Sequence, residues 1–161
     1  MKFYCNITNN FPGGLFKYVQ IVSLYDVHSL EYEFFRQIAQ FFPFMKNLTV
    51  INDKLQKNKL HRKSKKVNNQ DLSIIEYPHL IRLCLCEAHD DYAEQLLVDT
   101  EICLSNNVCL FVDYEALKRV TENFTRHATQ INWAKLHSLC LDGEYEVTKF
   151  LKDYFPQTNI V

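Results

Sequence analysis

The sequence contains little glycine and proline, and this scarcity excludes several classes of protein. Its 161 residues include 3 glycines and 4 prolines, too few for a fibrous chain or a low-complexity disordered one. So few glycines also leave little room for the glycine-rich loops that cradle phosphates. Because 47% of the residues are hydrophobic and 14% are aromatic, the chain has enough apolar side chains for the core of one ordinary domain.

The sequence also lacks an excess of one charge and long apolar runs. Its formal net charge is -1, so the protein as a whole does not have the basic surplus of a polyanion binder. No apolar stretch reaches the roughly 18 residues of a membrane-spanning helix. The N-terminus, Met1 to Asn6, lacks the basic-then-apolar pattern of a signal peptide. We therefore expect a soluble protein of the cytoplasm or the nucleus, with no membrane partner.

Sequence motifs of catalysis and metal binding are absent as well. Neither H-E-x-x-H nor G-x-S-x-G occurs. Cys84-x-Cys86 is the only close cysteine pair, and without a second pair or suitably spaced histidines it does not predict a zinc site. Cys140 with His137, and Cys86 with His89, are near in sequence, but no motif surrounds either pair. The sequence predicts no enzyme, no catalytic residue, no metal and no cofactor.

What the sequence does contain is a recurring apolar pattern. A large apolar or aromatic residue is followed by apolar residues three, six and eight positions later. The full copies are Phe16, Val19, Val22 and Leu24; Phe42, Met45, Leu48 and Val50; Tyr77, Leu80, Leu83 and Leu85; and Trp133, Leu136, Leu139 and Leu141. Asn107 interrupts a weaker copy made of Leu104, Leu110 and Val112. Phe155 and Val161 begin a further copy.

The spacing of these copies is typical of repeats that each combine a strand and a helix. The copies lie 26, 35, 27 and 29 positions apart, measured between Val22, Leu48, Leu83, Leu110 and Leu139. These lengths, except the 35, are close to those of leucine-rich repeats. Each copy ends in the alternating pair of a short strand. Helical spacing of apolar residues follows over 31–42, 92–98, 114–131 and 144–154.

Alternation of strands and helices predicts parallel strands, each reached by a crossover. We expect residues 1–161 to form one α/β domain, a leucine-rich-repeat-like solenoid of about five strand–helix repeats with a parallel sheet on its concave side. The expected boundaries are 16–41, 42–76, 77–103, 104–132 and 133–154, with a partial repeat at 155–161 and a basic insertion at 53–70. A compact α/β domain with an open parallel sheet is the alternative, but it gives no reason for the repeated eight-residue spacing.

The runs Met45-Leu48-Val50, Leu80-Leu83-Leu85 and Leu136-Leu139-Leu141 resemble the irregular leucine-rich repeats attached to F-box proteins. The asparagine that commonly closes the strand turn in that family occurs here at Asn52, while Asp26, Glu87, Tyr114 and Gly143 occupy its place elsewhere. The resemblance implies a repeat surface that binds a substrate protein for a cullin ubiquitin ligase. No segment reads as the F-box helix bundle, so we expect a substrate-recognition half, either a fragment or a member without the ligase-binding module.

The pattern also predicts which side chains face a partner, because residues that alternate with core positions point away from the core. The candidates for partner binding are Tyr25, Ile51, Arg82, Phe111, Asp113 and Asp142. Aromatic residues and arginine are common anchors of binding hot spots, and aspartates suit a basic or mixed epitope. We expect a monomer that binds a protein on the concave strand face; the alternative is that an irregular strand or a capping loop buries Phe111 and Ile51.

One segment is strongly basic although the chain is not. Seven of the 18 basic residues fall within thirteen positions, namely Lys54, Lys57, Lys59, Arg62, Lys63, Lys65 and Lys66. Such a run is typical either of a solvated loop or of a nuclear-import signal or phosphate-contacting patch. Because the run contains no aromatic residue to stack on bases, we expect a plain loop and not a nucleic-acid site. Nucleic-acid binding through 54–66 and a compact α/β enzyme remain the alternative functions.

Overall fold

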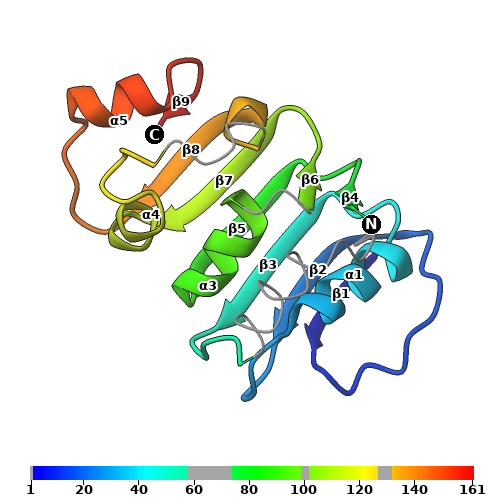
Figure 1. Cartoon of the computed structure of the whole chain (residues 1–161). Helices are drawn as coiled ribbons and strands as arrows, with labels where there is room; N and C mark the ends of the chain where they lie inside the picture. The colour runs from blue at the N-terminus through cyan, green and yellow to red at the C-terminus, as the bar shows by residue number, and fades with distance from the viewer. Residues whose placement is uncertain (1, 58–73, 99–101, 127–131) are drawn as a thin grey trace.

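Parallel strands form the framework of the protein and lie side by side in chain order (Figure 1). The computed structural model describes residues 2–57, 74–98, 102–126 and 132–161. Within them one sheet contains, in spatial order, β1 (Lys2–Ile7), β2 (Val19–Tyr25), β3 (Asn47–Asn52), β5 (Arg82–Ala88), β7 (Val108–Asp113), β8 (Leu136–Asp142) and β9 (Asn159–Ile160). All neighbouring pairs are parallel. The expected α/β class with a parallel sheet is therefore confirmed.

The crossovers between these strands carry the helices. The helical elements are α1 (Tyr32–Phe41), α3 (Asp90–Ala93), the π-helical turn η1 (Glu94–Val98), α4 (Tyr114–Val120), the 3-10 turn η2 (Trp133–Lys135) and α5 (Lys149–Tyr154). A second parallel sheet pairs β4 (Ile75–Tyr77) with β6 (Ile102–Leu104). Within the described residues, no helix combines the length and the apolarity that a membrane crossing demands.

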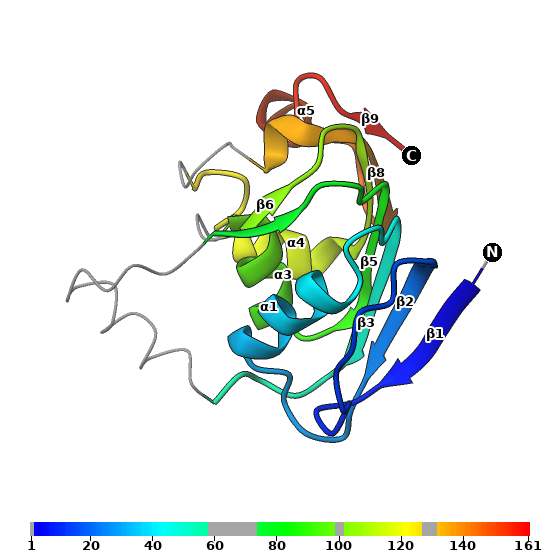
Figure 2. The same cartoon turned by 90° about the vertical axis from the view of Figure 1, so that its right-hand side faces the viewer.

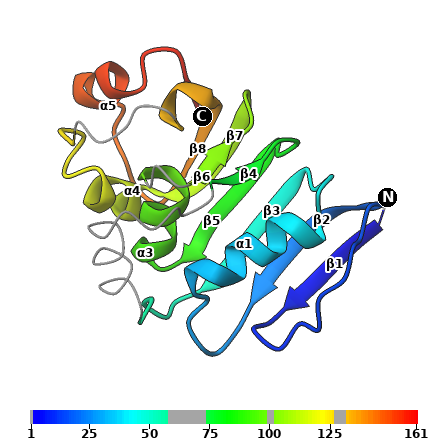
Figure 3. The same cartoon turned by 45° about the vertical axis from the view of Figure 1, so that its right-hand side comes forward.

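Helices α1, α3 and α4 follow one another across the same face of the sheet (Figure 3). This arrangement follows from the strand order, because right-handed crossovers between parallel strands taken in chain order all pass over one face. The small sheet of β4 and β6 lies on that side too (Figure 2). The opposite face of the large sheet is covered by none of the described helices (Figure 2).

Alternating burial along the strands forms the core on the helical side. In β3 and β7, buried residues alternate with partly exposed ones almost without exception. The residues at equivalent places in the apolar pattern are direct register partners across five strands, and each is 0% exposed: Val22, Leu48, Leu83, Leu110 and Leu139. Each buried leucine of this row stabilises the fold by roughly 1.5–3 kcal/mol relative to an exposed one.

The entry to each strand also recurs as a backbone hydrogen bond. In five copies of the pattern, the N–H of the residue at the second position donates to the carbonyl of the residue at the first position. The pairs, donor first, are Val19 and Phe16, Met45 and Phe42, Leu80 and Tyr77, Leu136 and Trp133, and Thr158 and Phe155. Phe42 and Phe155 end α1 and α5 with almost the same backbone angles, φ -122° and ψ 63° against φ -120° and ψ 64°. Both precede proline, which disfavours helical backbone at the residue before it.

Two expected helices are shorter than their apolar spacing predicts. The helix expected over 114–131 ends at Val120. Buried Thr121 follows, its hydroxyl donates to the Leu117 carbonyl, and it accepts from the N–H of Phe124. Glu122, Asn123 and Phe124 then have positive φ angles of 54°, 58° and 62°, which a right-handed helix does not allow. Residues 127–131 lie outside the described part of the chain.

The helix expected over 144–154 was also wrong at its beginning, since α5 starts only at Lys149. Thr148 is its N-cap and accepts a hydrogen bond from the N–H of Leu151 at 3.2 Å. Of the apolar residues that predicted the longer helix, Leu151 is buried, whereas Val147 and Phe150 are 45% and 71% exposed. The periodicity therefore overestimated the length of the helix because only its last part packs on the core.

Sequence analysis assigned no element to β1, β4 or β6. β1 adds a strand beside β2, ahead of the expected first repeat. In the small sheet, Tyr77 pairs in register with Leu104, two residues that occupy the same first position of the apolar pattern. Asn107, the residue that interrupts that copy, has a φ of 65° in the turn before β7. Asparagine tolerates this left-handed conformation better than most residues.

Candidate protein-binding surface

The face of the large sheet opposite α1, α3 and α4 presents the side chains that alternate with the core. We call it the open face and define it by two rows of register partners: Ile21, Asn47, Arg82, Cys109 and Ser138; and Ser23, Thr49, Cys84, Phe111 and Cys140. Arg82 is exposed and the other members are partly exposed. The residues of both rows are thus at least partly accessible to solvent.

Arg82 and Phe111 meet near the middle of the open face. The guanidinium carbon of Arg82 lies 4.8 Å from the centre of the Phe111 ring, within the range of a cation–π contact worth about 0.5–1 kcal/mol at an exposed site. The two residues come from adjacent strands, β5 and β7. This contact holds a long flexible side chain against a flat ring, so less side-chain entropy remains to be lost when a partner binds.

Tyr25 and Ile51 are register partners at the carboxyl ends of β2 and β3. Tyr25 is 45% exposed. Both residues line an open depression of about 690 Å³ that also includes Glu87, Asp90 and Arg119. Two of the predicted binding residues therefore belong to a concave site, which extends the open face beyond the ends of the strands.

Asp113 and Asp142 are register partners at the carboxyl ends of β7 and β8. The Asp113 carboxylate accepts a hydrogen bond from the N–H of Ala116 at 2.7 Å and caps α4, so this residue also has a structural role. Asp142 is exposed and accepts from the N–H of Gly143 at 3.0 Å. With exposed Glu87 at the end of β5, these carboxylates make this end of the open face acidic.

Thiols are frequent on and beside the open face, and two of them, Cys86 and Cys140, have raised pKa values. Burial, together with nearby Cys84, Asp142 and Asp113, raises the pKa of the Cys86 thiol to about 12. Burial also raises the pKa of Cys140. His89, imagined as a base for Cys86, uses Nδ1 to accept from the N–H of Asp91 at 3.2 Å. Since the thiolate is the reactive form, these groups give no support to a cysteine nucleophile.

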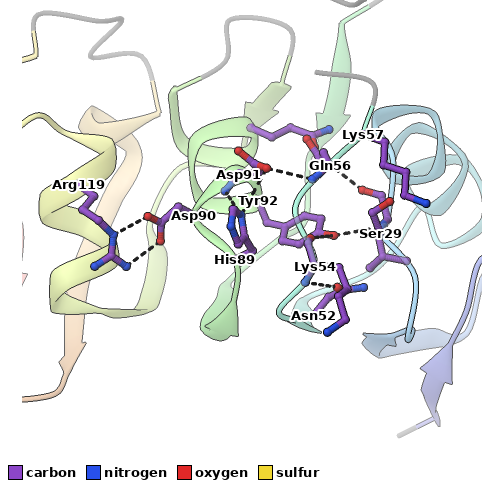
Figure 4. Close-up of polar contacts among 12 residues, drawn as sticks. Ser29, Asn52, Lys54, Gln56, Lys57, His89, Asp90, Asp91, Tyr92 and Arg119 are labelled. Atoms are coloured by element: carbon purple, nitrogen blue, oxygen red, sulfur yellow. Dashed lines mark hydrogen bonds and ion pairs between the residues drawn. The ribbon is translucent and has the colours of Figure 1, made fainter. Parts of the chain in front are cut away.

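A polar network follows the carboxyl ends of β2, β3 and β5 (Figure 4). Asn52 is 3% exposed, donates from Nδ2 to the carbonyls of Asp26 and His28 at 3.1 and 2.8 Å, and accepts from the N–H of Lys54. Buried Tyr92 accepts from the N–H of Leu30 and donates to the Lys54 carbonyl. The partners of Asn52 and Tyr92 are backbone groups of neighbouring loops, so these two side chains support the fold.

Sequence reasoning named two members of this network, Asn52 and Asp26, without predicting their contacts, and missed others. Asn52 was singled out by its place after a strand, and Asp26 occupies the same place one strand earlier. The Asp26 carboxylate accepts hydrogen bonds from the N–H groups of Asn9 and His28 at 2.7 and 2.9 Å. Gln56, which donates to the Leu30 carbonyl at 2.9 Å, gave no signal because polar loop residues are common and its burial depends on the fold.

The basic run lies mostly outside the described part of the chain. Lys59, Arg62, Lys63, Lys65 and Lys66 are not described. Lys54 and Lys57 are exposed. The Lys54 ammonium lies 2.9 Å from an Asp53 carboxylate oxygen, and the backbone N–H of Lys57 donates to Glu31 at 3.0 Å. Lys54 also lines the depression beside Tyr25 and Ile51, and neither described lysine belongs to the two rows of the open face.

Groups that bind metal ions are not assembled in the described ranges, where no three histidine, cysteine, aspartate or glutamate side chains come together as ligands. The open face instead combines an aromatic–arginine contact, an exposed tyrosine and an acidic end. No protein-family model matches the chain, and no curated protein and no solved structure is significantly similar to it.

Proposed function

We propose that this protein is a binding module that holds another protein on the open face of its sheet. The observation that carries the proposal is the accessibility of that face, on which side chains from five adjacent strands lie in register. Of the six candidate residues, Arg82 and Phe111 belong to the open face, Asp113 and Asp142 to its acidic end, and Tyr25 and Ile51 to the adjoining depression. Tyrosine and arginine are enriched among residues that dominate binding energy.

The chemistry of the face favours a partner segment that is basic at one end and apolar along its length. Glu87, Asp113 and Asp142 supply negative charge where β5, β7 and β8 end, and such complementarity steers association and fixes orientation. Ile51 and Phe111 supply apolar contact area next to that charge. A partner with lysine or arginine opposite the acidic end satisfies both features.

As to architecture, the proposal includes an irregular leucine-rich-repeat-like solenoid. Three observations support it: strands in chain order, register between equivalent pattern positions, and the same entry hydrogen bond in five copies. Attachment to an F-box-type ubiquitin ligase is a finer proposal that rests only on the sequence resemblance. Recovery of cullin-ligase subunits together with the partner supports it, and a partner recovered without them opposes it.

The test is affinity capture with two matched triple variants. Tyr25→Ala, Arg82→Ala and Phe111→Ala remove two rings and a cation from the open face. Leu15→Ala, Phe44→Ala and Lys46→Ala remove a similar set of exposed groups that precede β2 and β3. With circular dichroism unchanged in both variants, we expect captured proteins to be lost from the first only. Equal capture by the two variants contradicts the proposal.

The charge preference is tested separately by reversal. Glu87→Lys with Asp142→Lys should weaken binding of the captured partner and reduce its dependence on salt. Glu76→Lys with Glu115→Lys is the control, since both residues are exposed in β4 and α4. Binding that is unaffected by the first pair rules out the proposed basic contact, even where the triple variant confirms the surface.

A further inference from the structure

A second concave site lies away from the open face, between α5, η2 and the segment that follows α4. It is a pocket of about 560 Å³, within the size range of small-molecule sites. Its walls include Phe124, Arg126, Trp133, Phe150, Tyr154 and Phe155. No residue of the two open-face rows lines it, so it is independent of the proposed protein-binding surface.

Aromatic rings from distant parts of the sequence form the walls of this pocket. Trp133 contacts Phe155 and Tyr154 edge to face, with ring centres 5.2 and 5.9 Å apart. Phe124 meets Tyr154 in the same manner at 5.9 Å. Phe150 lines the pocket from α5 and is 71% exposed. Edge-to-face contacts favour this arrangement of the rings without locking it, and an exposed phenylalanine beside them provides apolar surface that a ligand can bury.

The indole of Trp133 has an unmet hydrogen-bonding need. Trp133 is 4% exposed, and its Nε1–H finds no acceptor among the described residues. Buried donors without acceptors are rare because they lose their hydrogen bonds to water without replacement. A ligand that parts the neighbouring rings slightly and brings an acceptor to this N–H removes that cost.

The charged groups of the pocket limit what this ligand can be. Arg126 donates two hydrogen bonds to the Glu94 carboxylate, both at 3.2 Å, so its charge is already balanced. Asp153 also lines the pocket and disfavours an anionic ligand. The acceptor is therefore a neutral group such as a carbonyl oxygen.

We propose that this pocket binds a small, neutral aromatic molecule whose carbonyl oxygen accepts a hydrogen bond from Trp133 Nε1–H. The ring of the ligand packs against Phe150, Tyr154 and Phe155. A small molecule fits better than a macromolecule because the space is a pocket bordered by three separate segments, and a flat protein surface does not fill such a space.

The test uses the fact that Trp133 is the only tryptophan of the chain. The full-length protein, labelled with ¹⁵N, has a single indole cross-peak, which is followed during titration with acetophenone and with ethylbenzene. The two probes are similar in shape, but only acetophenone has an acceptor. We expect saturable movement of the cross-peak, with acetophenone bound about two to ten times more tightly, as one neutral hydrogen bond allows.

Two variants control for location. Phe150→Ala should weaken acetophenone binding about three- to tenfold by removing one ring contact. Phe44→Ala removes a phenylalanine that is 45% exposed outside the pocket and should leave binding unchanged. An indole cross-peak that does not move saturably, equal affinity for both probes, or equal weakening by the two variants overturns the proposal; an aromatic side chain of a protein partner then becomes the better occupant.

Discussion

Single polar residues at the ends of the strands hold together loops that are distant in sequence. Asn52 connects the loop after β2 with the loop after β3, since it bonds to backbone groups of Asp26, His28 and Lys54. Asp26 connects the loop after β1 with the loop after β2 in the same manner. Buried groups of this kind are fully satisfied only in the native arrangement, so their removal destabilises strongly.

Replacing Asn52 with alanine should therefore lower the free energy of unfolding by about 2–3 kcal/mol, because buried carbonyl and N–H groups lose their partners. Urea unfolding, followed by the fluorescence of Trp133, measures the change. Asn47→Ala is the matched control, as Asn47 is partly exposed on the open face and should cost less than about 0.5 kcal/mol. Similar losses in both variants would show that the loop contacts of Asn52 contribute little.

Asp26 predicts a dependence of stability on pH. Burial alone would raise its pKa, but hydrogen bonds from the N–H groups of Asn9 and His28, and the neighbouring His28 side chain, lower the pKa below the ordinary value of 3.8. A folded-state pKa below the unfolded one stabilises the protein above pH 3.8, and this contribution is lost as the pH falls toward the folded-state value. The loss of unfolding free energy between pH 7 and about pH 3 should be smaller in the Asp26→Asn variant than in the wild type.

Exposed Asp53 provides the control for this pH experiment. The hydrogen bond from Lys54 lowers its pKa too, against a small effect of burial. Because solvent and salt screen an exposed pair, 0.5 M salt, about three times the physiological ionic strength, should remove the Asp53→Asn effect and leave most of the Asp26→Asn effect. Equal sensitivity of both variants to salt would mean that the backbone hydrogen bonds of Asp26 are not the cause.

Between elements, ion pairs connect consecutive crossovers, and the pair of Arg119 with Asp90 has the shorter contacts. Arg119 of α4 donates Nε and Nη2 to the two carboxylate oxygens of Asp90 in α3, at 2.5 and 2.9 Å (Figure 4). The Arg119 and Asp90 side chains are 57% and 30% exposed, so solvent screens the pair. Its two-pronged geometry nevertheless makes it stronger than a single surface contact.

Arg119→Ala should lower the free energy of unfolding by about 0.5–1 kcal/mol. Lys118→Ala is the matched variant, since Lys118 contacts Glu115 within the same helix at 3.6 Å and should cost only about 0.3–0.5 kcal/mol. Equilibrium urea unfolding compares the two variants. An Arg119 variant that is as stable as the wild type would show that this ion pair does not help to align α3 with α4.

The elements also show where sequence analysis succeeds and where it does not. The strands with a full pattern copy, such as β3 and β5, were predicted because alternation and burial coincide there. β6 has three residues and pairs with β4 on the helical side, which no local pattern indicates. The end of α4 depends on the buried hydroxyl of Thr121, a tertiary effect that helical periodicity cannot contain.

For the whole molecule, burial of the apolar pattern is complete in β5 but only partial at Leu141 of β8, which implies a gradient of stability from the centre of the sheet toward β8. Leu83 is 0% exposed in β5, between β3 and β7. Leu83→Ala should cost about 2–5 kcal/mol of unfolding free energy. Leu141 in β8 is only partly buried, and Leu141→Ala should cost less than half as much. Guanidinium unfolding measures both, and equal losses would contradict the gradient.

The open face and the pocket beside Trp133 differ in how far the sequence alone can predict them. The open face follows from alternation alone, so Arg82 and Phe111 were named as outward residues, but their 4.8 Å contact required the register of two strands. The pocket beside Trp133 was missed entirely. Its walls come from residues 124–126, 133–136 and 150–158, and only the folded chain brings these segments together.

Each of the five strands from β2 to β8 in the large sheet contributes one side chain to each row of the open face. The proposed recognition and the folding of the protein therefore depend on different residues of the same strand. A change at Thr49 or Cys84 alters what a partner meets without touching Leu48 or Leu83 beneath. Ligand preference can therefore drift or be redesigned one strand at a time, over residues that are far apart in the gene, while the hydrophobic interior stays constant.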